Sequence, residues 1–425
     1  MTKELTNKDK VEAGLPRRRR KETLFRATGM IATAIGIAFL AVFFATLIGK
    51  GASAFVQTYM RLDVELTAEQ IAPGGELDLA YADFDGLVRT ALRKEFPEVS
   101  GRAERRELYR LLSIGAGYQI RDLVAENVDL IGTTQTLWLP TSATVDMLMK
   151  GNIDASLDAS LRPLSDQQIG WINSLQRAGR LDKRFNAALF TNGDSREPEL
   201  AGIKGAMMGS FFMLVVTIAL SFPIGVAAAI YLEEFAPKNR WSDLVEVNIN
   251  NLAAVPSIVF GLLGLAVFIN WMSLPRSAPL VGGLVLALLT LPVIIIASRA
   301  AIKAVPPSIR EAAMGLGASR MQVVFHHVMP LAMPGMLTGA IIGMSRALGE
   351  SAPLLMIGMI AFIVDVPGGF TDPSTALPVQ IYLWADSPER AFAERTSAAI
   401  IVLLAFLVLM NLAAVIVRRR MEQKW

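Results

Sequence analysis

Six long runs of apolar residues constrain this chain more than any other feature of its sequence. A helix needs about 20 apolar residues to cross the hydrocarbon core of a bilayer. Runs that approach or exceed this length occur at residues 27–48, 205–232, 252–269, 280–297, 336–364 and 397–417. They predict an all-α polytopic membrane protein with six transmembrane helices, which agrees with a content of 53% hydrophobic and 19% charged residues.

The first run, residues 27–48, has two possible interpretations. Five basic residues precede it, and Ala52-Ser53-Ala54 resembles the small-residue site at which a signal peptide is cleaved. However, the run holds 22 residues without a charge, whereas the apolar core of a signal peptide usually has about 7–15. We therefore predict that residues 27–48 remain in the protein as the first transmembrane helix.

The distribution of lysine and arginine predicts how the six helices are oriented. If the N-terminus lies inside the cell, the predicted cytoplasmic segments hold 19 Lys and Arg residues. The short outer loops, residues 270–279 and 365–396, then hold only 3. Because Lys and Arg are enriched in short cytoplasmic loops, we expect both termini, residues 1–26 and 418–425, to be cytoplasmic.

A long outer segment, residues 49–204, differs from the rest of the chain. It contains 17 basic and 22 acidic residues between Gly49 and Gly202, and it is long enough to bury a core of its own. The residue patterns predict a mixed α/β periplasmic domain, either a docking or gating domain or an accessory insertion that packs on the helices. Helices are expected at 86–96, 102–113 and 166–178, and strands at 131–139 and 185–191.

The composition excludes several kinds of functional site. The chain has no cysteine, which rules out disulfides, thiolate metal sites and cysteine nucleophiles. Two histidines do not favour a His-rich metal centre, and a net charge of +3 does not favour nucleic acid as a partner. Since no combination of side chains indicates a catalytic site, we expect a protein that is not an enzyme and binds no metal or cofactor of its own.

The cytoplasmic segment between the fourth and fifth runs, residues 298–335, is the most informative part of the chain. Two prolines end the extension of the fourth run, Ser308 is a candidate N-cap, and Glu311 follows at the spacing of a capping box. Gly317 permits a sharp corner, and Pro330 is expected to end a second short amphipathic helix. Such an elbow cannot bury its own apolar faces, so we expect it to fit a groove on a partner protein.

This elbow resembles the EAA loop of ABC-importer permeases. It matches the pattern of that loop at Glu311, Ala312, Ala313, Gly317 and Pro330. His327 and Met329 stand where Ile and Leu are usual, and we expect these departures to soften the docking face but to leave the elbow intact. The resemblance implies that the loop docks on an ATPase subunit and passes the motion of that subunit to the membrane helices.

The resemblance also requires that another polypeptide supplies the ATPase. A nucleotide-binding P-loop has the pattern G-x-x-x-x-G-K-[ST]. Its nearest fragment, Gly49-Lys50, fails because Phe44 and Gly51 occupy the other two defining positions. The chain therefore lacks this motif, and we expect a partner ATPase to use the ATP.

Three further stretches, residues 231–235, 251–265 and 346–355, resemble phosphate permeases. The resemblance covers about residues 200–417 and is to the PstA-type subunit of the phosphate ABC importer. It implies the type I importer permease fold over residues 205–417 and a place in the bacterial inner membrane. It also implies a PstC-type second permease subunit, PstB-type ATP-binding subunits, a periplasmic PstS-type phosphate-binding protein and phosphate as partners. The basic N-terminal cluster indicates membrane lipid as a further partner. The outer segment resembles an N-terminal extension found on a subset of these permeases.

Arg346 and Glu350 are the candidate residues of the translocation path. A charge within the bilayer is costly, so an intramembrane arginine indicates a functional site. The two residues are four positions apart and able to pair on one helix face, and a guanidinium suits a phosphate oxyanion through bidentate hydrogen bonds. The alternative is a static ion pair that fastens the fifth helix to a neighbour.

Two other functions are compatible with the residues. The first is an importer of another oxyanion, such as molybdate, sulfate or phosphonate. The second is a membrane sensor or scaffold whose outer domain binds a partner. A secondary transporter is disfavoured, because the elbow indicates an ATPase partner and the chain contains no inverted repeat that we can identify.

Overall fold

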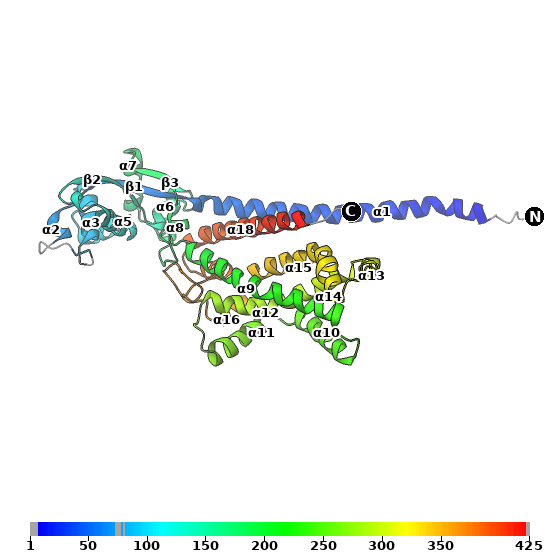
Figure 1. Ribbon diagram of the computed structural model, residues 1–425. Coiled ribbons are helices and arrows are strands. Elements are labelled where there is room, and N and C mark those ends of the chain that lie inside the picture. The colour runs from blue at the N-terminus through cyan, green and yellow to red at the C-terminus, as the bar shows by residue number, and fades with distance from the viewer. Residues whose placement is uncertain (1–6, 73–77, 80, 422–425) are drawn as a thin grey trace, which may run out of the picture.

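The computed structural model describes residues 7–72, 78–79 and 81–421. Figure 1 shows an elongated molecule in which one very long helix, α1, runs beside the C-terminal helix, α18. A domain of strands and short helices lies at one end of these two helices, and the other long helices form a bundle alongside them. We call this domain, residues 52–203, the outer domain.

The helix α1 spans Asn7–Gly51. Over the described residues it joins the predicted N-terminal segment, residues 1–26, and the first apolar run, residues 27–48, into one rod. Many of its apolar side chains are exposed, for example Phe25 and Phe39. Such a surface suits a helix whose neighbours are lipid tails, which are as apolar as the side chains themselves.

The C-terminal end of α1 packs against α18, which spans Ala391–Met421. A Cβ atom added to Gly51 would lie 2.7 Å from Cδ1 of Ile401 and 2.9 Å from the backbone carbonyl carbon of Ser397. Glycine is therefore required at this position, because any side chain would push the two helices apart. This close approach brings the outer domain, which follows α1, against the beginning of α18.

The remaining bundle contains α9, α12, α15 and α17. Two of these helices, α9 and α12, lie in close contact, and a Cβ atom on Gly283 of α12 would come within 2.5 Å of Val216 of α9. Small residues that allow backbones to approach in this way are typical of helix packing in membranes. The four helices span Lys204–Ile230, Pro279–Lys303, Met329–Gly349 and Leu377–Ala385, and α9 continues as the π-helical turn η4, Tyr231–Phe235.

The third apolar run, residues 252–269, does not form the single straight helix that we predicted. It is divided between α10, Arg240–Ala253, and α11, Ser257–Leu263, which continues as η5, Gly264–Trp271. The two parts are bent by 103°. The cause is Pro256, whose extended backbone (φ −56°, ψ 137°) precedes α11 and cannot continue α10.

The fifth apolar run, residues 336–364, is also interrupted, so the prediction of one helix over this range is wrong. The helix α15 ends at Gly349, and Glu350 has an extended backbone with ψ 121°. A short helix, α16, follows at Ala352–Met356, and the chain is then non-helical up to α17. Glycine followed by a proline-containing segment breaks the helix here, although the side chains remain apolar.

Among the described residues, five helices are long and apolar enough to cross a membrane, or up to six if the bent pair counts as one span. The predicted number of six spans therefore depends on how the bent pair lies in the bilayer.

The outer domain is built around a sheet. Within the part of the chain that the structure describes, its strands lie in the order β2-β1-β3 and all pairs are antiparallel. The central strand β1 alternates buried Met60, Leu62 and Val64 with exposed neighbours, which directs one face to the core. The strands span Val56–Glu65, Thr134–Pro140 and Leu181–Phe185.

Short helices complete the outer domain. The helices predicted at 86–96 and 166–178 are confirmed, whereas the strand predicted at 185–191 is wrong, because only Phe185 lies in a strand and the chain then turns into α8. The α-helices α2 to α8 span Ala68–Ile71, Phe84–Glu95, Arg102–Tyr109, Gly115–Glu126, Ala143–Met149, Asp166–Arg177 and Ala188–Thr191. The 3-10 turns η1 to η3 span Ala52–Phe55, Val128–Leu130 and Ala159–Leu161.

Candidate functional site

The first limb of the elbow is the helix α13, Pro307–Gly315. It begins at Pro307 and not after Ser308, so the predicted N-cap is wrong and Ser308 lies inside the first turn. Pro306 has the extended backbone of a cap position (ψ 137°), and Pro307 suits the first helical position, where no amide hydrogen is needed. Gly317 makes the predicted corner with a φ of +88°, a value that favours glycine.

The second limb of the elbow continues directly into the fifth long helix. It begins with α14, Arg320–Gln322, where Ser319 and Gln322 form a capping box, and proceeds through the π-helical turn η6, Val323–Val328, into α15. We predicted that Pro330 ends this limb, and the structure shows that it does not. Pro330 is the second residue of α15, directly after the π-helical turn η6, and the helical backbone continues through it.

This continuity determines where the elbow lies relative to Arg346. The helical segment Arg320–Gly349 carries the elbow at one end and Arg346 at the other. Pro330 and Arg346 lie about 24 Å apart along the helix at about 1.5 Å per residue. The elbow and Arg346 therefore lie at the two ends of one helical segment.

The residues of the EAA pattern divide into an inner and an outer face. Ala313 is buried among Val226, Ile302 and other apolar side chains at the ends of α9 and α12. Glu311, Ala312, Gly317 and Pro330 are exposed. The elbow also exposes several large apolar side chains, which are Met314, Leu316 (91% exposed), Met321 and Phe325.

An ion pair that the sequence reasoning missed fixes the first limb of the elbow to the end of α9. The guanidinium of Arg310 donates two hydrogen bonds to Oε1 of Glu234, at 2.7 and 3.1 Å. The same group donates to the carbonyl oxygens of Val305 and Ile302, at 2.7 and 3.0 Å. The second limb is attached to the same place, because Arg320 donates to the carbonyl oxygen of Glu234. We call Glu234, Arg310 and Arg320 the elbow clamp.

A second set of charges joins α9, α10 and α12 beside the elbow clamp. Arg299 of α12 pairs with Glu233 at 2.5 Å and with Glu246 of α10 at 2.7 Å, and Lys303 lies 3.4 Å from Glu233. The side chains of Glu246 and Lys303 are 44% and 59% exposed. A signal for these pairs is present in the sequence. Glu233 and Glu234 are adjacent at the end of an apolar run, and the elbow carries arginines that could pair with them.

The structure places Arg346 and Glu350 together, but not on one regular helix face. Arg346 lies in the last turn of α15, and Glu350 follows the end of that helix. Nε of Arg346 and Oε1 of Glu350 are 3.5 Å apart, and the two side chains are 43% and 19% exposed. Next to them, Ser345 donates to the side-chain oxygen of Asn411 in α18 at 2.8 Å. The hydrogen bond between the two side chains is therefore long, and the guanidinium of Arg346 remains accessible.

Comparison with known proteins gives the family. The model described as "Binding-protein-dependent transport system inner membrane component" matches residues 221–423, and a domain of unknown function (DUF3333) matches residues 12–159. The probable ABC transporter permease YqgI of Bacillus subtilis (strain 168) is 36% identical over 155 residues, which are 36% of this chain and 52% of YqgI. The phosphate transport system permease PstA 1 of Mycobacterium tuberculosis (strain CDC 1551 / Oshkosh) is 32% identical over 217 residues, which are 51% of this chain and 70% of that protein. The chain belongs to the phosphate transport system permease family.

Membership in this permease family has direct consequences. The chain has the type I ABC importer permease fold and is a multi-pass protein of the inner membrane. It is a permease subunit and not an enzyme, and an importer of this class works with an ATPase and a substrate-binding protein. Among solved structures, the inward-facing MetNI methionine ABC transporter covers 51% of the chain with 19% identity and a TM-score of 0.39.

Proposed function

We propose that this permease is the PstA-type subunit of an ATP-driven importer of inorganic phosphate. The observation that carries the proposal is the continuous helix Arg320–Gly349, which connects an EAA-type elbow to an arginine that suits an oxyanion. The names of the relatives support phosphate as the cargo, since PstA of Haemophilus influenzae is also 32% identical over 200 residues, 70% of its length.

The elbow is the proposed docking site of a separate, PstB-type ATPase subunit. Its exposed face combines the carboxylate of Glu311 with large apolar side chains such as Leu316. An amphipathic helix with such a face fits a groove on a partner. In this proposal the ATPase uses the ATP, and the chain itself binds no cofactor. Ala312, Ala313, Gly317 and Pro330 shape the elbow so that movement of the ATPase is passed to α15.

Arg346 is the proposed phosphate-binding side chain of the translocation path, and Glu350 controls its availability. With Nε and Oε1 at 3.5 Å, the pair can open without losing a strong hydrogen bond. A phosphate that arrives would offer Arg346 a planar pair of acceptor oxygens, which a guanidinium binds better than a single distant carboxylate oxygen.

The proposed arrangement in the membrane has six spans, of which one is the bent pair α10–α11. Both termini are cytoplasmic, and the outer domain lies in the periplasm, in line with the distribution of Lys and Arg. One elbow serves one ATPase subunit. We therefore expect a PstC-type second permease subunit with its own elbow, and a PstS-type binding protein that delivers phosphate from the outer side.

The test is uptake of labelled phosphate by the full assembly in proteoliposomes. We expect uptake that requires ATP and that unlabelled sulfate or molybdate does not compete away. Arg346→Gln and Glu350→Gln should each lower the rate about 10- to 100-fold, because a hydrogen bond to a charged group is worth about 1.5–3 kcal/mol. Arg276→Gln, in an exposed outer loop, is the control. Normal uptake by both variants would show that the pair is only structural, and preference for another anion would replace phosphate as the cargo.

A further inference from the structure

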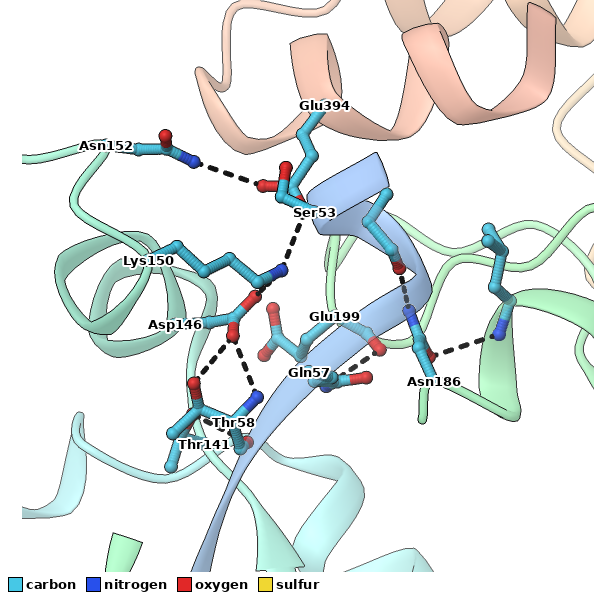
Figure 2. Close-up of polar contacts among 12 residues, drawn as sticks. Ser53, Gln57, Thr58, Thr141, Asp146, Lys150, Asn152, Asn186, Glu199 and Glu394 are labelled. Carbon is cyan, nitrogen blue, oxygen red and sulfur yellow. Dashed lines mark hydrogen bonds and ion pairs between the residues drawn. The ribbon is translucent and has the colours of Figure 1, made fainter. Parts of the chain in front are cut away.

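A buried ionic network joins the outer domain to the beginning of α18 (Figure 2). Nζ of Lys150, at the end of α6, lies 2.6 Å from Oδ2 of Asp146 and 2.7 Å from Oε1 of Glu394 in α18. The side chains are only 5%, 9% and 10% exposed, respectively. Asn152 adds a hydrogen bond to Oε2 of Glu394 at 3.2 Å. One lysine therefore bridges two elements that are 244 residues apart in the chain.

The network continues from Lys150 into the central strand of the outer domain. Oδ1 of Asp146 accepts hydrogen bonds from the amide and the hydroxyl of Thr58, both at 2.8 Å. Thr58 in turn is held by Thr141, whose hydroxyl donates to its carbonyl oxygen at 3.0 Å. Figure 2 shows these groups as a single chain of contacts from strand β1 to α18. The sheet is thereby connected to α18 through ion-paired side chains that are at most 10% exposed.

A second set of buried contacts holds the same junction from the other side. The amide of Asn186 donates to the carbonyl oxygen of Ala54 at 2.9 Å, which fixes the end of β3 to the turn after α1. Nε1 of Trp384 in α17 donates to Asp194 at 3.0 Å. Apolar residues close the junction and form one buried cluster, which includes Leu189, Ile203, Leu377, Trp384, Phe392 and Ala398.

The charges at the junction are close to balance. Arg395 is buried and lies within electrostatic range of Asp146, Glu394 and Glu199. Burial raises the pKa of the Glu199 carboxyl above its ordinary value, which favours its neutral form. Lys150 and Arg395 are the two cations that face the carboxylates Asp146 and Glu394. A buried group of charges is stable only as a set, because removing one member leaves another without a partner.

We propose that Lys150 is a positioning residue for transport, whose bridge between Asp146 and Glu394 makes the outer domain and α18 move as one body. The effect on transport rests on the proposed function, whereas the bridge itself is a property of the fold. Of the two roles that the sequence left open, the bridge favours a docking domain over an accessory insertion, because anything that binds a domain mounted in this way acts on α18.

The first experiment compares three lysine variants of the full assembly. Lys150→Met removes the bridge, Lys150→Arg keeps the charge, and Lys94→Met is the control. Lys94 forms an ion pair of similar length with Glu65 in the same domain (2.6 Å), but the two side chains are 52% and 51% exposed. Amide hydrogen exchange of α6 and of the first turns of α18 reports whether the two elements are still held together.

We expect Lys150→Met to raise exchange in both elements and to lower uptake about tenfold or more, because Asp146 and Glu394 lose the cation that forms ion pairs with both of them. Lys150→Arg and Lys94→Met should behave like the unchanged protein. Wild-type exchange in Lys150→Met, or faster exchange in α6 alone, would overturn the inference. Hydrogen exchange in α6 and in α18 does not depend on which substrate is transported. If the unchanged protein fails to import phosphate, the proposed function is wrong, but the exchange experiment still tests the bridge.

A second experiment uses the absence of cysteine from the chain. Lys150→Cys combined with Glu394→Cys places two unique thiols at the bridge, and a short bis-methanethiosulfonate cross-linker joins them reversibly. If the domain and helix move as one body, cross-linking should restore the uptake that the uncross-linked double variant has lost. Uptake that is blocked by the cross-link and recovers on reduction would show that the domain must move relative to α18, and would overturn the inference.

Discussion

The elbow clamp and the outer junction are both ion-pair networks, but they lie in different surroundings. At the elbow, Arg310 and Glu234 are 21% and 11% exposed, and the neighbouring Lys303 is 59% exposed. At the outer junction, Lys150 and its two partners are at most 10% exposed. Exposed pairs are weak and can be exchanged for water or for other partners, whereas breaking a buried pair is costly. Because Arg310 and Lys303 are more exposed than any member of the outer junction, the network at the elbow is the better suited of the two to rearrange.

The same substitution at the two ends should give the largest contrast. Lys150→Met removes the cation that forms ion pairs with both Asp146 and Glu394, and we expect a loss of about 3–5 kcal/mol of stability. Lys303→Met should cost less than about 1 kcal/mol, because its pair with Glu233 is 3.4 Å long and Lys303 itself is 59% exposed. Thermal unfolding of the two purified variants measures the difference. Equal losses would mean that burial does not distinguish the two networks.

A break in the elbow clamp should affect coupling more than stability. Arg310→Gln removes the ion pair in which Arg310 donates two hydrogen bonds to Glu234. We expect ATP hydrolysis to continue while the phosphate imported per ATP falls about tenfold, because a hydrogen bond to a charged group is worth about 1.5–3 kcal/mol. Arg240→Gln, an exposed arginine of α10, is the matched control.

The reversed pair distinguishes coupling from folding. Glu234→Arg combined with Arg310→Glu should regain part of the import per ATP that either single variant loses. If the double variant is no better than the singles, the pair acts through its other hydrogen bonds, which Arg310 donates to the carbonyl oxygens of Val305 and Ile302.

Salt should separate the two networks by a smaller amount. Raising the ionic strength from about 0.1 M to about 1 M shortens the screening length from about 10 Å to about 3 Å, and exposed charges are screened far more than buried ones. We expect faster hydrogen exchange in α13 at high salt, which corresponds to a loss of at most about 1 kcal/mol in the free energy of opening this helix. Exchange in α6 should be unchanged. A response of α6 as large as that of α13 would contradict the buried character of the outer junction.

The parts of the fold that depend on neighbouring residues were predictable from the sequence. Gly317 indicated a corner, and the structure has a φ of +88° there. The failures at Ser308 and Pro330 have local causes too. Two successive prolines moved the helix start to Pro307, and a π-helical turn before α15 placed Pro330 where a proline does not end a helix.

The pairs that join distant segments could not be predicted from one sequence. Glu234 and Arg310 are 76 residues apart, and Lys150 and Glu394 are 244 apart. A charge pattern identifies candidates for pairing but not which candidates meet, because that depends on how the helices pack. For the same reason the sequence indicated Arg346 and Glu350, which are close in the chain, and missed both long-range networks.

The last prediction tests the electrostatic balance of the outer junction through Glu199. Burial, which outweighs a hydrogen bond from Ser113, raises the pKa of this carboxyl in the folded protein. A raised pKa means that the folded state retains the proton longer than the unfolded state does. The stabilising contribution is therefore fully present below the ordinary pKa of glutamate and is lost as the pH rises through the folded-state pKa.

Glu199→Gln should remove this pH dependence, because a neutral amide replaces a carboxyl that the fold prefers to keep neutral. Thermal unfolding between pH 5 and pH 8 should show the variant gaining stability relative to the unchanged protein as the pH rises. The exposed Glu98→Gln is the control and should show no such gain. If Glu199→Gln loses stability at neutral pH instead, the carboxylate is needed as a charged partner of Arg395, and the junction contains three anions rather than two.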